Sequence, residues 1–429
     1  MKNSLLLLST AFIAASIFTS CLKDKCTSNI TYIRVDPVYK TLEEIHNGTA
    51  VKEAPRELEK PGQLYYYHNT LFVVEKGEGI HVIDNADPLN PINKAFIKIP
   101  GNEDIGIKDD LLYANSYIDL LVINLQTHEV VGRAESVFQP WFYDLTSDQV
   151  IVEYVETEVT ETMNCEDQQK LYSRGGFFYQ GGFGFEGDLV NIAANNDASS
   201  ESGGIGLAGS LAHFSIIGNY LYTIQHDGFH LDIFDLTNPN APEKANTVNV
   251  GVQLETLFPY GDKLFIGSNV GMYIYDNSDP INPTQLGAFE HARACDPVFV
   301  DGNYAYVTLW DGSSCGSGPN QLDVIDISDL TNPILKSSFS MENPHGLSVK
   351  ENTLLLCEGD YGFKTFDNTD PITVGNHLLG HIKNMKATDV ISLPGNSNVA
   401  MVIGEGGFYQ YNFDNPSDLK LLSLIPVKR

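Results

Sequence analysis

The chain of 429 residues has few of the features that would reveal a chemical activity. It carries only 26 basic side chains against 55 acidic ones, and the resulting net charge of −29 repels the phosphate groups of nucleic acids. It has 2 Trp and 6 Cys, and it contains no HExxH motif, no Cys/His cluster and no long amphipathic helical pattern. Paired carboxylates are too common in so acidic a chain to indicate acid/base catalysis. Nucleic-acid binding is therefore excluded, and no enzyme class is indicated by a motif.

A membrane-spanning helix is not predicted from the N-terminal apolar run. That run, from Leu5 to Phe18, follows Lys2 and is too short to cross a bilayer comfortably, so it fits a cleaved signal segment. Small residues before Cys21 resemble a bacterial lipobox, although Phe18 replaces the usual aliphatic residue. We expect residues 1–20 to be a signal peptide, Cys21 to be lipidated and residues 21–31 to be a tether. The alternative is an ordinary secretory signal followed by an incidental cysteine.

What the chain does contain is a repeated hairpin. Each copy is an alternating aromatic and aliphatic run, a turn of Asp, Asn and Pro, and a second apolar run, as in GMYIYDNSDPINPTQLGAFEH from Gly271. Seven copies place a signature residue at Asp84, Asn124, Asp235, Asp276, Asp326, Asp367 and Asn412. In such turns Asp and Asn side chains bond to the following backbone and proline stops strand pairing, so the turns need no ligand.

A second hairpin precedes each copy, as in DPVFVDGNYAYVTLW from Asp296. Most signature residues are 40 to 50 positions apart, and four antiparallel strands at that period predict the blades of an all-β propeller. The exception is the gap from Asn124 to Asp235, where the run from Pro140 to Thr160 fits a first hairpin without a second. We predict one propeller domain over residues 32–429, with eight blades slightly favoured over seven and a Gly-rich insertion at about 161–209.

Two smaller expectations concern the N-terminal part of this domain. The run from Ile30 to Tyr39 is predicted to be a strand that joins the C-terminal strand Leu419 to Val427 and closes the ring, which would remove exposed strand edges. The stretch from Lys40 to Ala54 is predicted to contain a turn or two of helix.

The phrases LDVIDISDLTNP, LLVINL and GIHVIDNADPLNP resemble the LVIVD repeat of β-propeller lipoproteins from the Bacteroidetes group, over nearly all the chain after Tyr32. The resemblance implies an outer-membrane lipoprotein, periplasmic or surface-exposed. It implies no activity, because members of that family are recognised by repeat and lipobox.

The candidate binding residues come from the innermost strand of each predicted blade. Alignment of the units places a mostly acidic set at one mouth of the central channel, namely Glu103, Trp141, Glu255, Asp296, His345 and Asp389. Carboxylate oxygens suit a hard cation, so this set, called the collar, is predicted to bind calcium or a basic small ligand. The alternative is that each residue satisfies backbone groups of the neighbouring blade. No cofactor is required by either interpretation.

The cysteines after Cys21 belong to an oxidising compartment if the signal peptide is correct. Cys295 lies just before the first predicted strand of one blade, and Cys315 lies in the loop after the second strand of that blade. The first strand starts and the second strand ends on the same face of the blade, so we predict that the two cysteines form a disulfide there. Free thiols or pairing with Cys165 are the alternatives. Cys357 alternates with Leu355 in a predicted strand and is expected to be a buried thiol.

These observations favour a lipid-anchored binding or scaffold module of the cell envelope, with a protein or glycan ligand and a membrane attachment through the N-terminal lipid. The alternative from a different class is a polysaccharide hydrolase or lyase that uses the acidic collar, and it rests on fold analogy alone.

Overall fold

The structure is a computed structural model that describes residues 27–140, 143–144, 148–164, 192–193, 205, 207–208, 210–225, 227–291, 297–310, 319–395 and 397–428. The chain divides into two compact units, Met1–Val38 with Glu153–Glu186, and Tyr39–Val152 with Gly187–Arg429. The described part of the first unit, residues 27–38 and 153–164, is called the arm, and the second unit is called the propeller. No helix in the described ranges is long and apolar enough to cross a membrane.

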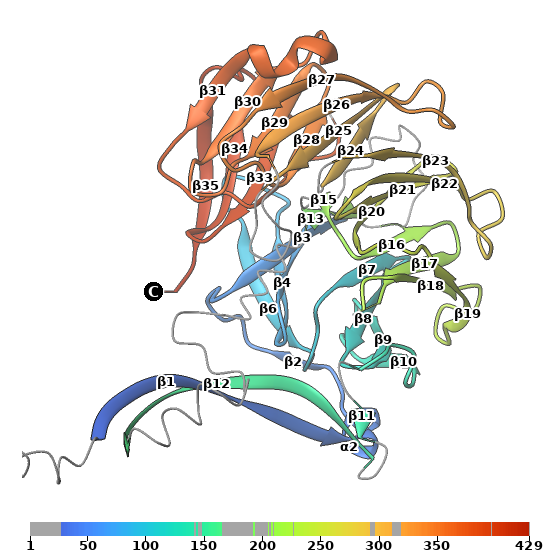
Figure 1. Cartoon of the computed structure of the whole chain (residues 1–429), viewed down its shortest axis with the longest axis vertical. Coiled ribbons are helices and arrows are strands. Elements are labelled where there is room, and N and C mark those ends of the chain that lie inside the picture. Colours follow the sequence, from blue (N-terminus) through green and yellow to red (C-terminus); the bar gives the residue numbers. More distant parts are fainter. Residues whose placement is uncertain are drawn as a thin grey trace, which may run out of the picture. The chain divides into compact units, whose positions relative to one another are not determined.

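The propeller consists of seven antiparallel sheets that follow one another along the chain (Figure 1). The first strands of successive blades lie against one another, so they surround the hub. Blade 1 contains β3 (Pro61–Tyr67), β4 (Thr70–Glu75), β5 (Gly79–Asp84) and β6 (Ile92–Lys98), and blade 2 contains β7 (Ile105–Lys108), β8 (Leu111–Ser116), β9 (Asp119–Asn124) and β10 (Val130–Ala134). Blade 3 contains β16 (Phe214–Ile217), β17 (Tyr220–Ile224), β18 (His230–Asp235) and β19 (Glu243–Asn249). Blade 4 contains β20 (Leu254–Tyr260), β21 (Lys263–Ser268), β22 (Gly271–Asp276) and β23 (Thr284–Glu290).

The remaining blades have the same order of strands from the hub outward. Blade 5 contains β24 (Val298–Asp301), β25 (Tyr304–Leu309), β26 (Gln321–Asp326) and β27 (Ile334–Ser340). Blade 6 contains β28 (Leu347–Lys350), β29 (Thr353–Cys357), β30 (Phe363–Asp367), the 3-10 helix η1 (Pro371–Asn376) and β31 (Leu378–Ile382). Blade 7 contains β32 (Asp389–Ser392), β33 (Val399–Gly404), β34 (Gly407–Asn412) and β35 (Lys420–Pro426). Two short strands extend blade 1, with β2 (Val51–Glu53) at its outer edge and β14 (Leu207–Ala208) at its inner edge.

The predicted all-β propeller of four-stranded blades is confirmed, with seven blades rather than the slightly favoured eight. The run from Pro140 to Thr160 does not start a blade: it supplies β11 (Tyr143–Asp144) and most of β12 (Gln149–Asn164), which share a sheet with β1 (Thr27–Thr41). The physical reason is the charge pattern of β12. Its exposed glutamates fall on both faces of the strand, so neither face is apolar enough to pack between two blades.

The signature turns have the predicted geometry in all seven blades. In each, the side-chain oxygen of the signature residue accepts a hydrogen bond from the backbone N–H two positions later, for example Ser278 to Asp276 at 3.1 Å and Asp414 to Asn412 at 3.1 Å. The turns also join blades. The hydroxyl of Tyr222 in blade 3 donates to the carbonyl of Pro280 in the turn of blade 4 at 3.0 Å.

Close packing against these turns explains particular glycines in the outer strands. A Cβ atom on Gly287 of β23 would lie 2.3 Å from the carbonyl oxygen of Leu330 in the turn of blade 5. Gly271, at the start of β22, has a φ of +156°, and its Cβ would lie 2.4 Å from the carbonyl oxygen of Phe289. Glycine is therefore required where a turn or an outer strand approaches the backbone this closely.

Ring closure differs from the prediction. β1 pairs with β12, so the expected pairing of Ile30–Tyr39 with the C-terminal strand is wrong. Blade 7 takes all four of its strands from consecutive sequence, and it packs on blade 1 through apolar side chains that include Leu71 and Met401. A parallel bridge between Leu58 and Val427 adds a backbone link, in which the N–H of Lys428 donates to the carbonyl of Leu58 at 2.7 Å.

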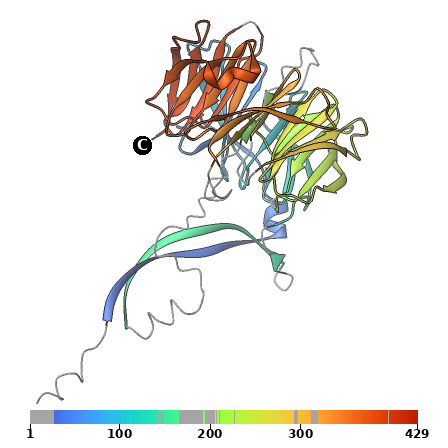
Figure 2. The same cartoon turned by 45° about the horizontal axis from the view of Figure 1, so that its top comes forward.

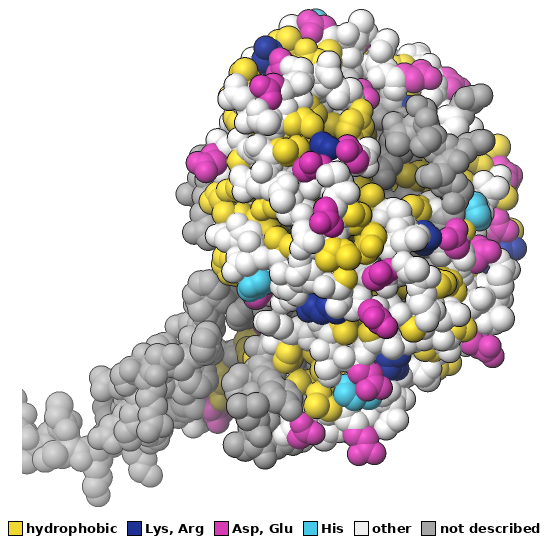
Figure 3. Space-filling view, turned by 90° about the vertical axis from the view of Figure 1, so that its right-hand side faces the viewer, with side chains coloured by type: hydrophobic (Ala, Val, Ile, Leu, Met, Phe, Trp, Pro, Cys, Tyr) yellow, Lys and Arg dark blue, Asp and Glu magenta, His cyan; other side chains and the backbone are white. Residues whose placement is uncertain are grey.

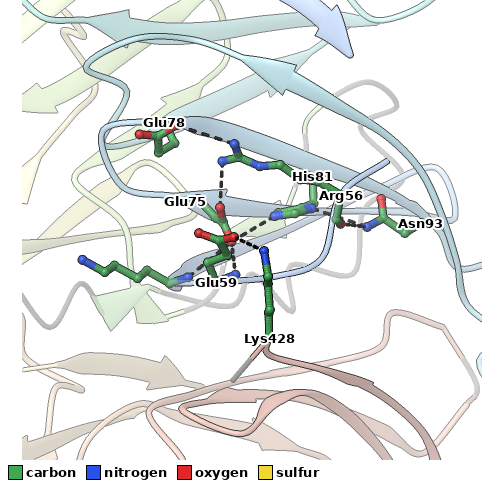
Figure 4. Close-up of polar contacts among 8 residues, drawn as sticks. Arg56, Glu59, Glu75, Glu78, His81, Asn93 and Lys428 are labelled. Atoms are coloured by element: carbon green, nitrogen blue, oxygen red, sulfur yellow. Dashed lines mark hydrogen bonds and ion pairs between the residues drawn. The ribbon is translucent and has the colours of Figure 1, made fainter. Parts of the chain in front are cut away.

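A charged cluster surrounds this link (Figure 4). The Glu75 carboxylate at the end of β4 is almost fully buried and accepts from Arg56 at 2.8 Å and from the N–H of Glu59 at 2.5 Å, and His81 Nε2 lies 3.1 Å away. Lys428 pairs with Glu59 at 3.1 Å. Burial alone would raise the pKa of Glu75, but the contacts with His81, Glu59 and Arg56 together lower it to about 2. The cluster therefore holds the segment before β3 beside the C-terminus.

The short helix α2 (Leu42–His46) lies where helix was predicted. Thr41 caps its first turn in a capping box with Glu44, and Ile45 packs with Ile118 and Val150. Arg133 of β10 donates to the carbonyl oxygens of Ile45 and Gly48, which attaches this segment to blade 2.

The arm consists of the greater part of β1 and of β12, which lie side by side as a long ribbon (Figures 1 and 2). Hydrogen bonds join Thr162 to Asn29 at 2.6 Å and Thr31 to Thr160 at 2.9 Å. Since these contacts advance in opposite directions along the two strands, the strands are antiparallel.

Candidate functional site

A segment of the chain itself crosses the hub of the propeller. Leu207 and Ala208 of β14 pair with Tyr66 and Tyr65 in blade 1, and Ile205 forms a bridge with Lys108 in blade 2. The following strand β15 (Ser210–Leu211) pairs with β13 (Ile192–Ala193) and lies against β20 and β32. The described residues of 205–212 are called the hub segment. It contacts inner strands on several sides of the ring, so it occupies the position where a channel ligand would bind.

Asp104 fixes one end of the hub segment. Its carboxylate accepts hydrogen bonds from the N–H groups of His213 at 2.6 Å and Phe214 at 2.9 Å, from that of Ile105 at 2.6 Å, and from the Tyr65 hydroxyl. The side chain is only 1% exposed. Burial raises the pKa of Asp104 to about 7, although these hydrogen bonds act in the opposite direction. The group therefore holds backbone and is not free to bind a ligand.

Asp389 occupies a related position at the start of β32. It accepts from the N–H of Val390 at 2.8 Å and from the Ser210 hydroxyl at 3.3 Å, and the same hydroxyl accepts from the N–H of Leu347 at 3.0 Å. Its second oxygen, Oδ2, is buried and accepts no hydrogen bond from the residues that the structure describes. Burial raises the pKa of Asp389 to about 8, so the carboxyl group is largely protonated at neutral pH.

His345 lies beside the hub in blade 6, packed against Trp310 with ring centroids 4.5 Å apart. The His345 side chain is 5% exposed, and burial lowers its pKa to about 4, so the imidazole is neutral at physiological pH. The carbonyl oxygen of His345 accepts from the Thr308 hydroxyl at 2.9 Å. Neutral and enclosed, this ring supplies no charge to a ligand in the channel.

The collar residues are found in three different situations. Glu103 and Glu255 are half-buried, and the Glu103 carboxylate lies 4.0 Å from Lys76 Nζ. His345 and Asp389 are buried as described above. Trp141 and Asp296 lie outside the described residues. Within the described ranges no group of three or more His, Cys, Asp or Glu side chains could hold a metal ion, and calcium binding by the collar stays a prediction.

The residues that the sequence did not identify are Asp104, Tyr65 and Ser210. A signal for Asp104 existed, because it immediately precedes an inner strand, one position after the predicted Glu103. Ser210 immediately follows the predicted insertion at about 161–209, and no periodic pattern marks it. Cys357 is buried and free, as expected, and burial raises the pKa of its thiol. Cys21, Cys165, Cys295 and Cys315 lie outside the described residues, so lipidation and the disulfide stay predictions.

Comparison with known proteins agrees with the fold. Residues 292–341, which include blade 5, match the LVIVD repeat family. No curated protein is significantly similar in sequence. The computationally designed protein Ika8 is 11% identical with a TM-score of 0.50, covering 89% of this chain and 92% of the designed one. A protein from Lactobacillus plantarum is 12% identical with a TM-score of 0.51, covering 86% of this chain and 97% of its own. BamB from Moraxella catarrhalis is 10% identical with a TM-score of 0.48, covering 88% and 92%. At these identities the likeness to Ika8 and to the Lactobacillus plantarum protein shows the fold alone.

Proposed function

We propose that this chain is a lipid-anchored protein of the cell envelope whose β-propeller acts as a binding or scaffold module. The observation that carries this proposal is the hub segment. Asp104 and Asp389, which stand at the starts of two inner strands, accept hydrogen bonds from the protein's own backbone and from Ser210. A ligand in the channel would have to displace the hub segment, so binding on the outer surface is favoured.

The outer surface offers suitable chemistry. Asp and Glu side chains are spread over the face shown in Figure 3, between patches of hydrophobic side chains, and Lys and Arg are fewer. In blades 1, 5 and 7 the first or second residue of the outer strand, beside the signature turn, is aliphatic and about half exposed, namely Ile92 (53%), Ile334 (50%) and Leu421 (52%). The ligand class that fits such a surface is a protein or a glycan.

The anchor part of the proposal rests on the lipobox-like residues before Cys21. The test is growth with an alkyne-tagged fatty acid, followed by fractionation of wild type and Cys21→Ser. We expect the tag and membrane attachment to depend on Cys21, because several acyl chains on one residue make a lasting anchor. Proteolysis of intact cells then separates surface exposure from a periplasmic location. An untagged, soluble wild-type protein would contradict lipidation.

The binding function is tested separately, with purified protein. Incubation with a panel of polysaccharides should give no reducing ends or unsaturated products, whereas cross-linking in cells should give one partner in stoichiometric amount. The polysaccharide hydrolase or lyase alternative predicts the reverse. Turnover that disappears in Asp296→Asn and His345→Ala, with folding unchanged, would replace the scaffold proposal with the enzyme.

A further inference from the structure

Among the described residues, one strand edge of the arm is not paired with another strand. β12 is bonded along one edge to β1, and the other strand of its sheet, β11, pairs only with Gln149 and Val150. No further strand among the described residues joins this sheet. Along residues 153–164, β12 therefore directs a row of backbone N–H and C=O groups away from β1. Such a row is a template for another strand.

The opposite edge of the ribbon is less suited to pairing. β1 contains Pro37 in its last third, and this residue is exposed. Proline has no N–H, and within sheets it is found on edge strands with its nitrogen facing away from the neighbouring strand. A strand added to β1 would lose a ladder hydrogen bond there. β12 has no proline, and its Val, Ile and Thr residues favour strand structure.

The charge of β12 defines what kind of strand can be added. It carries four exposed glutamates, Glu153, Glu156, Glu158 and Glu161, and no Lys or Arg. Because side chains alternate along a strand, Glu156 and Glu158 lie on one face, and Glu153 and Glu161 on the other. Directly opposed side chains of opposite charge stabilise a pair of strands and like charges destabilise it. An added strand therefore meets carboxylates on both faces.

Apolar side chains in the same stretch are also incompletely covered. Tyr154 is 51% exposed and Val155 is 44% exposed, on opposite faces of β12. A two-stranded ribbon without further packing is marginally stable in water, and a third strand improves its stability. The arm thus combines an open edge, four like charges and uncovered apolar groups along one strand.

We propose that the arm binds an extended, basic polypeptide segment, which adds as a third strand to the open edge of β12. Backbone hydrogen bonds hold the segment, its Lys and Arg side chains pair with the four glutamates, and its aliphatic side chains cover Tyr154 and Val155. This inference deepens the proposed binding function and rests on it, because it assigns the chemistry of one partner.

The probe for the test is the synthetic peptide Lys-Thr-Val-Arg-Thr-Arg-Val-Thr-Lys, which places a basic residue opposite each glutamate in either strand direction. Binding to the full-length protein is followed by fluorescence anisotropy, and the backbone is followed by amide hydrogen exchange. We expect binding with protection of residues 153–164. A peptide of the same sequence with N-methylated amides should lose binding, because strand addition needs its N–H groups. Absence of binding, or binding without protection of 153–164, would overturn the proposal.

Charge reversal supplies the matched comparison. The arm variant Glu153→Lys, Glu156→Lys, Glu158→Lys and Glu161→Lys should weaken binding of the basic peptide by about tenfold or more, and it should gain binding of a peptide with Glu in place of Lys and Arg. The control Glu57→Lys, Glu129→Lys, Glu243→Lys and Glu290→Lys changes the net charge equally on exposed propeller residues. Equal loss in both variants would show general electrostatic attraction and reject the arm as the site.

The N-methylated peptide keeps the test valid if the arm variant folds poorly, since it uses wild-type protein. A negative result here is distinguishable from failure of the proposed function. A stoichiometric partner that cross-links only to the propeller would reject the arm and leave the scaffold proposal in place, whereas glycan turnover would reject the scaffold proposal itself.

Discussion

The hydroxyl of Ser210 donates to the Asp389 carboxyl group at 3.3 Å, although the two residues are 179 positions apart in the sequence. Asp389 opens the inner strand of the last blade, and Ser210 belongs to the segment that crosses the hub. The same hydroxyl accepts from the N–H of Leu347 in blade 6. One serine side chain thus connects the hub segment with two neighbouring blades.

Ser210→Ala should loosen the hub segment. The substitution leaves the buried N–H of Leu347 without its acceptor, and an unsatisfied buried group costs about 1–3 kcal/mol. We expect faster amide exchange in residues 207–214 than in wild type, with the outer strands unchanged. Ser278→Ala, in an exposed turn, is the control. Unchanged exchange would mean that strand pairing alone holds the segment.

Asp389→Asn should change the pH dependence of stability. In the unfolded chain the carboxyl group ionises near its ordinary pKa of 3.8, but in the folded protein it keeps its proton until about pH 8. The free energy of unfolding contributed by this group therefore falls as pH rises between these values. In urea denaturation, the stability of Asp389→Asn relative to wild type should rise from pH 4 to pH 8.

Asp326→Asn should show the opposite pH dependence of stability, because the pKa of Asp326 is lowered whereas that of Asp389 is raised. Hydrogen bonds from the side chain and N–H of Ser328, with help from Lys336, lower the pKa of Asp326 to about 2. Its stabilising contribution is present above the ordinary pKa and disappears as pH falls toward 2. The loss of unfolding free energy in Asp326→Asn relative to wild type should therefore become smaller as the pH falls. Parallel pH profiles for the two variants would contradict the assignment of Asp389 as a protonated group.

Glu75→Gln should weaken ring closure. The neutral amide leaves the part-buried Arg56 with only the exposed Glu78 as a charged partner, and loss of one member of a buried pair costs about 3 kcal/mol. Because the pKa of Glu75 is lowered to about 2, the difference from wild type should be full above pH 4.5 and should diminish below it. Glu78→Gln removes an exposed contact of the same arginine at 3.6 Å and should cost less than about 1 kcal/mol.

Gly287→Ala should destabilise the contact between blades 4 and 5. The added methyl group would lie 2.3 Å from the carbonyl oxygen of Leu330, so the turn of blade 5 must move, at a cost of about 1–3 kcal/mol. Gly62→Ala adds the same group in β3, where its nearest neighbour is a carbonyl oxygen at 3.4 Å, and serves as the control. Equal unfolding midpoints for the two variants would show that the turn contact is unimportant.

The repeat made the blades predictable from particular residues. Asp276 and the six signature residues like it bond to their own turn, which is a local interaction, so the sequence was sufficient to place the turns and strands. The collar residues were predicted less accurately than the turns. Glu103 was chosen, but the neighbouring Asp104 is the group that holds the hub segment, because a shift of one residue reverses the direction of a side chain on a strand.

By itself, the sequence determined the strand pattern, the turn chemistry, the excess of acidic charge and the residues before Cys21, since each depends on neighbours along the chain. Only the tertiary structure decided the number of blades, the pairing of β1 with β12, the closure around Glu75 and the path of residues 205–212 through the hub. These features join distant segments such as Ser210 and Asp389, and their free energy comes from burial and hydrogen bonds that no local pattern encodes.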